Sequence, residues 1–333
     1  MISQGKRDRA EMASLSVGYQ GEPGAYSEAA AHEAFGAIGR SIVATGFTSF
    51  EEVFAALVAG KTEYAAVPIE NTLGGSIHVN YDLLLRYQGQ IHILGEHSFR
   101  VRHALLALPG VKKADIRQAM SHPQALSQTE AFLRNAQIKP VPSYDTAGSA
   151  KMVKEQGLRD TAAIASSRAA EVHGLEVLDF GIEDDSNNYT RFLVLGRVRC
   201  EIPDGVPTKT SVVFVPRKNE AGALFKTLSV FSVRDIDLSK IESRPFRPGS
   251  FATATLTARG GGTPSSTPKV EPDPAAAATS SCDSDPSHPA AKRQKADAAP
   301  LTAPGPQFLY AFYVDLLVRR GGIQTREPGA TRA

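Results

Sequence analysis

The chain has 333 residues, 42% of them hydrophobic, and a formal net charge of +2. This length allows two domains with a substantial core, and the small charge gives no reason to expect binding to nucleic acid or to a membrane. No apolar run approaches the roughly 20 residues of a transmembrane helix. Its two cysteines, Cys200 and Cys282, are too few for a disulfide framework or a metal cluster, which indicates an intracellular or organellar protein.

Residues 1–14 are expected to form an N-terminal tail. They contain basic residues but no apolar stretch, so they do not have the pattern of a secretory signal. Two acidic residues and the short length also make this segment a poor complete transit peptide, and a trimmed or partial one stays open.

Residues 15–200 alternate apolar runs with helical patterns, which is typical of an α/β domain. Helices are expected in "GAYSEAAAHEAF", after Ser49 with Glu52 as a capping box, around Leu83, in "PQALSQTEAFLRN" and in "DTAGSAKMVKEQG", where Asp145 or Thr146 would be the N-cap. Strands are expected over 15–19 and in "YAAVPIEN", "IHILGEH", "HALLALPG", "TAAIAS" and "FLVL".

The pattern changes near residue 205. The segment "KTSVVFVP" alternates as a strand, "GALFKTLSVFSVRDI" has one apolar helical face, and "DLSKIESRP" and "QFLYAFYVDLL" are further strands. Strand, helix, strand and strand make up most of a ferredoxin-like α+β unit. Residues 252–306 interrupt it with nine of the chain's 21 prolines and no aromatic residue, so they are predicted to be a disordered insertion.

Polar residues cluster at three strand ends, within 70–76, 121–128 and 187–191. Glycines let backbone approach a ligand, helix N-termini offer N–H donors to anions, and ligands of open α/β sheets bind at strand ends. The set is rich in amides and hydroxyls, with one arginine, but contains no metal-ligand cluster, nucleotide motif or nucleophile with its base. It suits a small polar anion such as a carboxylate, in either an enzyme or a solute-binding protein.

Other candidate motifs are weaker. Gly60-Lys61-Thr62 resembles the end of a phosphate loop, but the required earlier glycine is Ala55. The glycine-rich "QGEPG" either directs helix N–H groups toward an anion or is a plain tight turn. His92 and His97 have no third metal ligand in view, so they are interpreted as core or surface histidines.

Five motifs together resemble the prephenate dehydratase family, and their residues are most similar to those of the plastid arogenate/prephenate dehydratases of plants and algae. They are "YQGEPGAYSEAA", "VPIENTLGGSI", "SHPQALSQ", "DTAGSA" and "NNYTRFLVLG", in the family's order and with similar spacing. The segment "GALFKTLSVFSVRDIDLSKIESRP" is similar to the phenylalanine-binding ACT regulatory domain of these enzymes. The resemblance covers about residues 15–251 and 307–315.

The resemblance implies a bilobal catalytic domain over 15–200, like a periplasmic binding protein, and a ferredoxin-like ACT domain over 208–251 and 307–318. It implies a cofactor-free and metal-free reaction on a small-molecule substrate. Prephenate would lose carbon dioxide and water to give phenylpyruvate, or arogenate would lose both to give phenylalanine. The similarity to the plastid enzymes favours arogenate, with prephenate as a possible further substrate, and Gly196 could contribute to that choice.

The family also implies roles for single residues. Thr190 is expected to donate a hydrogen bond to the departing hydroxyl, with a relay or prior polarisation because threonine is a weak acid. Arg191 is expected to hold a substrate carboxylate or anchor the site, and Glu70 is either a buried general acid or a brace. The remaining catalytic matches are Asn71, Ser121 and Gln128, and the substrate-binding matches are Thr72, Gly75, Ser76, Gln124 and Phe192, of which Phe192 is expected to pack rather than react.

The ACT resemblance implies a phenylalanine site between ACT domains and hence a homodimer or homotetramer, in which phenylalanine favours one arrangement. The matching residues are Gly222, Ala223, Leu224, Glu242, Ser243, Arg244 and Pro245. After "FYVD" the sequence lacks the helix and strand that the family has there, so residues 319–333 form an atypical tail. Phenylalanine control is therefore expected to be weakened or absent.

Two alternatives stay open. The chain could be a non-catalytic sensor, in which a carboxylate- or amino-acid-binding domain is fused to an ACT domain, and binding without turnover would identify it. A truncated product that folds poorly would instead aggregate. By resemblance the expected location is the plastid stroma, or the cytoplasm if the short N-terminus is genuine.

Overall fold

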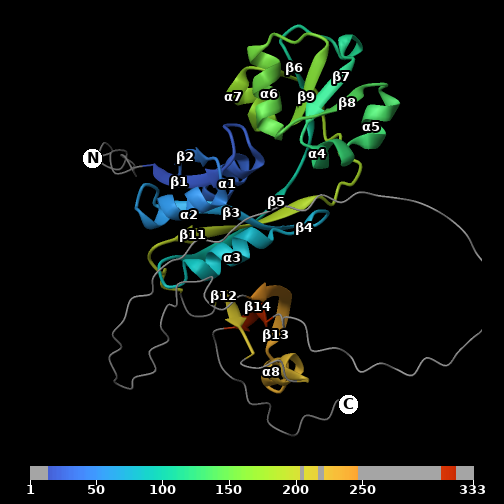
Figure 1. Ribbon diagram of the computed structural model, residues 1–333. Coiled ribbons are helices and arrows are strands. Elements are labelled where there is room, and N and C mark those ends of the chain that lie inside the picture. The colour runs from blue at the N-terminus through green and yellow to red at the C-terminus, as the bar shows by residue number, and fades with distance from the viewer. Residues whose placement is uncertain (1–13, 203–205, 217–220, 247–308, 320–333) are drawn as a thin grey trace, which may run out of the picture.

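The structure, a computed structural model, describes residues 14–202, 206–216, 221–246 and 309–319. It has two α/β lobes and a smaller C-terminal unit, which lies below α3 in Figure 1. The predicted fold class, a two-lobed α/β domain followed by an α+β unit, is confirmed. None of the described helices has the length and hydropathy needed to cross a membrane.

Three predicted segments lie almost wholly outside the described residues. They are the N-terminal tail, of which only residue 14 is described, the insertion over 252–306, and the tail over 319–333, of which only residue 319 is described. The proposed domain boundaries at these segments therefore stay predictions.

Lobe 1 contains a six-stranded sheet of order β2-β1-β3-β11-β5, with the short β4 paired to β3. Strands β1 to β3 are parallel, whereas β11 runs antiparallel between β3 and β5. The elements are β1 (Leu15–Gln20), α1 (Tyr26–Gly36), β2 (Ile42–Phe47), α2 (Phe50–Val58), β3 (Tyr64–Asn71), β4 (Gly75–Ser76), α3 (His78–Arg86), β5 (His92–Arg100) and β11 (Tyr189–Gly196).

Lobe 2 contains a five-stranded sheet of order β10-β6-β9-β7-β8. Its elements are β6 (Ala104–Ala107), η1 (Lys113–Asp115), β7 (Gln118–Ser121), α4 (Pro123–Ser127), α5 (Glu130–Asn135), β8 (Lys139–Pro142), α6 (Thr146–Glu155), β9 (Thr161–Ala165), α7 (Ser167–His173) and β10 (Glu176–Phe180). The chain crosses between the lobes twice, over 101–103 and over 181–188. These two crossings bring His103 and Asn188 between the lobes.

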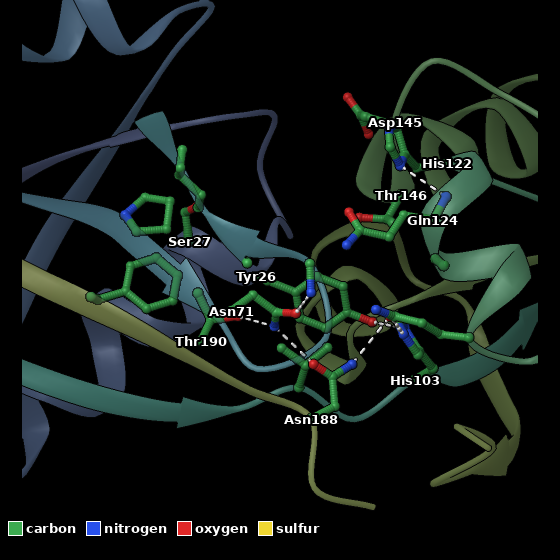
Figure 2. Close-up of a pocket in the computed structure, with 18 residues that line it drawn as sticks. Tyr26, Ser27, Asn71, His103, His122, Gln124, Asp145, Thr146, Asn188 and Thr190 are labelled. Atoms are coloured by element: carbon green, nitrogen blue, oxygen red, sulfur yellow. Dashed lines mark hydrogen bonds between the residues drawn. The ribbon is translucent and has the colours of Figure 1, made fainter. Parts of the chain in front are cut away.

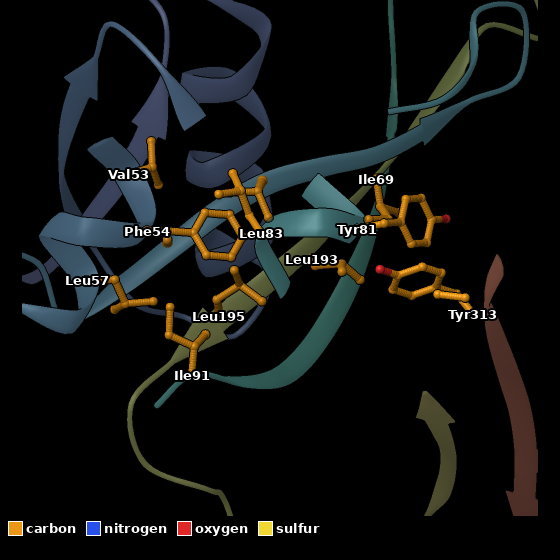
Figure 3. Close-up of a cluster of buried hydrophobic side chains, with 13 residues drawn as sticks. Val53, Phe54, Leu57, Ile69, Tyr81, Leu83, Ile91, Leu193, Leu195 and Tyr313 are labelled. Carbon is orange, nitrogen blue, oxygen red and sulfur yellow. The ribbon is translucent and has the colours of Figure 1, made fainter. Parts of the chain in front are cut away.

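The C-terminal unit is a three-stranded antiparallel sheet of order β12-β14-β13 with one described helix. Its elements are β12 (Pro207–Phe214), α8 (Ala223–Ser232), β13 (Asp237–Phe246) and β14 (Leu309–Arg319), in the predicted order of strand, helix, strand and strand. One face of this sheet packs on lobe 1. The ring of Tyr313 meets that of Tyr81 at 5.2 Å, within the buried cluster that also contains Ile69 and Leu193 (Figure 3).

Helices α2 and α6 begin at the predicted capping residues, but one predicted capping box and one predicted helix need correction. Ser49 Oγ accepts from the backbone N–H of Glu52 at 3.2 Å, but the Glu52 carboxylate accepts from Thr48 rather than from Ser49, so the predicted box is not reciprocal. Asp145 is the N-cap of α6, with its carboxylate on the backbone N–H of Gly148. The single helix predicted over 123–135 is two helices, because the chain breaks at Gln128 and Thr129.

The glycine-rich "QGEPG" turn lies against lobe 2. The hydroxyl of Ser166 donates to the carbonyl of Gly24 at 2.6 Å. Gly24 has φ +91°, and a Cβ there would stand 2.7 Å from Ala169 Cα, so only glycine fits this approach. Beside it, the buried carboxylate of Glu28 pairs with Arg168 of α7 at 3.0 Å. The turn is therefore a contact between the lobes.

Candidate active site

A cavity of about 310 Å³ opens between the two lobes (Figure 2). This volume falls within the range of small-molecule sites, roughly 300–1,000 Å³. Side chains of both lobes and both crossings line it: Tyr26, Ser27, Pro68, Asn71, Gly74, Gly75, Ile77, Val101, His103, His122, Gln124, Ala125, Gln128, Asp145, Thr146, Asn188, Thr190 and Phe192. Among these described residues Asp145 is the only carboxylate, and no lysine or arginine is present.

Strand geometry decides which residues of β3 and β11 reach the cavity. Thr190 is opposite Asn71 in the strand register, and Arg191 is opposite Glu70. Because successive side chains of a strand point to opposite faces, Asn71 and Thr190 line the cavity while Glu70 and Arg191 face away from it.

The amide of Asn71 organises the lobe 1 side of the cavity. Its Nδ2 donates to Asn188 Oδ1 at 2.8 Å and to Thr190 Oγ1 at 2.9 Å, and its Oδ1 accepts from the backbone N–H groups of Leu73 and Gly74. Thr190 Oγ1 therefore accepts a hydrogen bond. Within the described residues the Thr190 hydroxyl donates none, so its hydrogen is available to a ligand.

A chain of side-chain hydrogen bonds continues from Asn188 across the cavity, and we call it the polar chain (Figure 2). Asn188 Nδ2 donates to Gln128 Oε1 at 3.1 Å, and His103 Nε2 lies 2.9 Å from the same oxygen. The hydroxyl of Tyr26 lies 2.6 Å from His103 Nδ1. Burial lowers the pKa of His103, against the raising effects of the Gln128 hydrogen bond and of the Glu183 carboxylate, which favours the neutral ring.

Sequence reasoning did not select Tyr26 or His103, and it placed Asn188 in the polar cluster at 187–191 without giving it a role in the site. Tyr26 stands inside the first family motif, Asn188 directly precedes the "YTRF" segment, and His103 comes immediately before a buried strand. Those positions were the available signals. The histidines that were weighed instead, His92 and His97, lie on β5 and do not line the cavity.

The lobe 2 wall is built from the starts of α4 and α6. His122, Gln124, Asp145 and Thr146 face the cavity there. Gly74 of lobe 1 approaches this wall so closely that a Cβ on it would lie 2.5 Å from Gln124 Nε2. A larger residue at this position would therefore displace the Gln124 amide from its place in the cavity wall.

The structure divides the predicted site residues into two groups. Those that line the cavity are Asn71, Gly75, Gln124, Gln128, Thr190 and Phe192, and those that do not are Glu70, Thr72, Ser76, Ser121 and Arg191. Ser121 is fully buried and donates to the carbonyl of Ile164 at 2.6 Å. Thr72 donates to the carbonyl of Asn187 at 2.7 Å, which ties the loop after β3 to the second crossing.

Opposite the cavity, Arg191 stands in a group of charged side chains that we call the ionic cluster: Glu70, Glu96, Arg191, Lys209, Lys240 and Asp315. Arg191 lies 2.7 Å from Glu70, 3.0 Å from Glu96 and 3.1 Å from Asp315. Burial alone would lower the pKa of Arg191, but these carboxylates raise it. The cluster joins lobe 1 to the C-terminal unit.

The residues expected to bind phenylalanine fall on different surfaces of the chain. Glu242 accepts from Ser76 at 2.5 Å, and Arg244 pairs with Asp82 at 2.8 Å, so both face lobe 1. Strand alternation turns Ser243 and Pro245 toward the other face of the sheet. Gly222 precedes α8, and Ala223 and Leu224 form its first turn.

Comparison with known proteins gives a consistent result. The family model described as prephenate dehydratase matches residues 17–199. The chain is 49% identical over 233 residues to "Arogenate dehydratase/prephenate dehydratase 6, chloroplastic" of Arabidopsis thaliana, an alignment that covers 69% of this chain and 55% of that protein. The chain thus spans about half the length of the curated relatives that it matches.

Two solved structures are similar in fold. A prephenate dehydratase from Arthrobacter aurescens in complex with L-Phe is 30% identical, with a TM-score of 0.63 over 69% of this chain and 76% of that one. A protein described as a novel type of quorum quenching acylase is 28% identical, with a TM-score of 0.65 over 91% and 87%. The family match spans both lobes and their shared cavity, and the chain belongs to the prephenate dehydratase family.

Proposed function

We propose that this chain is a decarboxylating dehydratase of phenylalanine biosynthesis, a carbon–oxygen lyase that converts arogenate to phenylalanine, prephenate to phenylpyruvate, or both. Family membership and the names of the relatives support this proposal. The observation that carries it is the Thr190 hydroxyl at the cavity wall, which Asn71 holds as an acceptor so that its hydrogen is free. The reaction needs no cofactor, because loss of carbon dioxide and water makes either substrate aromatic.

In this reaction the bond between the ring and its carboxylate carbon breaks, and its electron pair enters the ring as the ring C–O bond breaks. Hydroxide leaves and takes up one proton to become water. Thr190 donates a hydrogen bond to the departing oxygen, which stabilises the developing negative charge. Since threonine is too weak an acid to supply the proton alone, the proton reaches the oxygen from solvent by way of this hydroxyl.

Neutral donors would hold the substrate carboxylates, because no lysine or arginine lines the cavity within the described residues. The amides of Gln124 and Gln128 are suited to this. The N-terminus of α6 is already capped by the carboxylate of Asp145, which lines the cavity and would attract an ammonium group of the substrate. This charge pattern favours arogenate, which carries an amino group, over the keto acid prephenate.

In this proposal Arg191 and Glu70 act as anchors rather than as substrate ligands. Their charges are paired with each other and with the C-terminal unit on the side opposite the cavity. Ser121, Thr72 and Ser76 would likewise position the strand ends and loops around the site.

The acylase activity named for one structural neighbour is less well supported by this cavity. An acylase of the nucleophilic type needs a hydroxyl or thiol beside a base. The imidazole of the polar chain, His103, is occupied by Tyr26 and Gln128, and Thr190 is bonded to an amide. We therefore favour the dehydratase.

The decisive experiment measures turnover of arogenate and prephenate by the purified chain, with phenylalanine and phenylpyruvate as the detected products. Thr190→Val removes the hydroxyl at nearly constant shape, and Thr190→Ser restores it. Loss of turnover in the first variant with substantial recovery in the second is expected, and the ratio of kcat/KM values identifies the preferred substrate. Binding of either compound by a folded protein without turnover would instead identify a sensor.

We further propose that the C-terminal unit, with residues 208–251 and 307–318, is an ACT domain that binds phenylalanine in a homodimer or homotetramer. The solved relative in complex with L-Phe supports phenylalanine as an effector. Because Glu242 and Arg244 are already paired with lobe 1, weak inhibition is expected. Inhibition with an affinity like that of full-length relatives would contradict this. The chloroplastic names of the relatives favour the plastid stroma as the location.

A further inference from the structure

His103 occupies a place in the cavity that the proposed chemistry does not use directly. It lies on the first crossing between the lobes, and only 2% of its surface is exposed. Its two ring nitrogens meet one residue from each lobe, Tyr26 of α1 and Gln128 at the end of α4. Both hydrogen-bonding positions of the imidazole are thus filled within the protein.

The direction of every hydrogen bond in the polar chain follows from two backbone groups. The N–H groups of Leu73 and Gly74 can only donate, so the side-chain atom of Asn71 that they meet is the oxygen. The Asn71 amide nitrogen must then donate to the oxygen of Asn188. The nitrogen of Asn188 in turn donates to Gln128, so the atom of Gln128 that it meets is the carbonyl oxygen.

This order fixes the tautomer of His103. Gln128 Oε1 can only accept, so His103 Nε2 carries the hydrogen and donates it. In the neutral ring Nδ1 is then an acceptor, and it receives the hydroxyl hydrogen of Tyr26. The Tyr26 hydroxyl also lies 3.4 Å from the backbone carbonyl of Arg102. The carboxylate of Glu183, which lies 3.9 Å from the Arg102 guanidinium, accepts from the His103 backbone N–H at 3.0 Å.

The consequence appears at Gln128. Gln128 lines the cavity, its oxygen is held by Asn188 and His103, and its Nε2 group donates to no other described residue, so this donor is available to a ligand. A glutamine without these two donors could rotate by half a turn and present its oxygen, which would repel a carboxylate. The orientation of this amide therefore decides whether the cavity offers a donor or an acceptor.

We propose that His103 is a positioning residue that keeps the Gln128 amide oriented as a donor to the anionic substrate. It does so as the neutral tautomer with hydrogen on Nε2, which the Tyr26 hydroxyl favours by donating to Nδ1. This inference rests on the proposed function for its substrate. A second proton on the ring would leave Nε2–H donating to Gln128 and would only turn the Tyr26 hydroxyl, which also lies 3.4 Å from the carbonyl of Arg102. The orientation of Gln128 should therefore depend on the presence of an Nε2–H donor and not on the charge of the ring.

The test compares three variants by steady-state kinetics at neutral pH. His103→Leu removes both nitrogens and should lower kcat/KM by about 10- to 100-fold, as loss of a positioning contact does. His103→Gln can still donate to Gln128, so it should recover most of this loss. His92→Gln, on β5 away from the cavity, should behave as the wild type.

A spectroscopic arm does not depend on turnover. Nitrogen-15 NMR of the eight histidines, with the His103 signals identified by their loss in His103→Gln, should show a protonated Nε2 and a bare Nδ1 at neutral pH. The opposite tautomer, or a cation, would overturn the inference. So would a His103→Leu enzyme within threefold of wild type, or no recovery in a folded His103→Gln. No turnover by the wild type would defeat the proposed function and leave the tautomer result to decide the His103 assignment.

Discussion

Strands β3 and β11 present two faces with different chemistry, and the residues that form them alternate along the same chain segments. On the cavity face, Asn71 and Thr190 are neutral and belong to a network of amides and hydroxyls. On the opposite face, Glu70 and Arg191 are charged and bind the C-terminal unit. Residues adjacent in sequence thus line the cavity or bind the C-terminal unit, and a one-residue slip in register would exchange the two faces.

The difference has a physical reason. For the proposed reaction, which releases hydroxide from a substrate with carboxylates, a cavity is better lined with preorganised neutral donors, which do not need to give up ion pairs when the substrate arrives. An interface between two parts of the chain tolerates charges when each charge has a partner. We therefore expect substitutions on the cavity face to change rates and substitutions on the other face to change stability.

The largest effect should come from Asn71→Asp. A carboxylate of the same shape cannot donate to Asn188 or Thr190, and it adds negative charge beside an anionic substrate. We expect kcat/KM to fall by about 100- to 1,000-fold, as when a preorganised donor is lost, with thermal unfolding nearly unchanged. Steady-state kinetics with the preferred substrate measures this. A loss below tenfold would mean that Asn71 does not organise the site.

Arg191→Met should mainly affect stability. It leaves the carboxylates of Glu70, Glu96 and Asp315 close together with less positive charge between them. Because Arg191 is 13% exposed and its partners between 16% and 36%, we expect a loss of about 2 kcal/mol, below the value for a fully buried pair. Urea unfolding measures it, and Arg191→Lys should recover part. A loss of substrate affinity without loss of stability would show that Arg191 holds the substrate carboxylate.

Acid should weaken the docking of the C-terminal unit. Burial alone would raise the pKa of both Glu96 and Glu242. Hydrogen bonds from Lys209 and Arg191 instead hold the pKa of Glu96 below the usual value of 4.5, and a hydrogen bond from Ser76 does the same for Glu242. Because their pKa is lowered in the folded state, these two carboxylates stabilise the docked C-terminal unit fully above pH 4.5, and this stabilisation is lost as the pH falls below that value. Limited proteolysis between pH 6 and 3.5 should release this unit before the lobes. Glu96→Gln should flatten the dependence.

The smallest effect is expected at an exposed pair outside both faces. Arg86 and Glu51 lie 2.6 Å apart, but they are 44% and 52% exposed. Solvent screens such pairs, so Arg86→Gln should change the free energy of unfolding by less than about 0.5 kcal/mol and leave turnover unchanged. A larger change in denaturant unfolding would mean that the contrast between the two faces is not specific to the β3–β11 pair.

Local patterns predicted much of the fold. The apolar face of α2, the cap at Asp145 and the strand at Phe192–Leu195 follow from spacing and residue type. Edge strands such as β2 and β8 were missed because their exposed residues give no clear apolar alternation. Their existence depends on pairing with neighbours far along the chain.

The candidate site was predictable where it is local and not where it depends on packing. Asn71 and Thr190 stand out beside buried strands, but the direction of Arg191 depends on strand register with Glu70. The contact between His103 and Gln128 joins residues 25 positions apart on different elements. No short pattern encodes that contact, because it depends on how α4 packs against the first crossing.

The path of the chain determines whether the two lobes can be separated or exchanged without loss of the site. Lobe 2 is inserted into lobe 1: the chain passes from lobe 1 to lobe 2 at 101–103 and returns to lobe 1 at 181–188. Each junction carries a member of the polar chain, His103 in one and Asn188 in the other. Part of the site thus lies on the two segments that connect the lobes. Neither lobe, grafted elsewhere or exchanged for a homologous one at these junctions, would carry the complete set of groups with it.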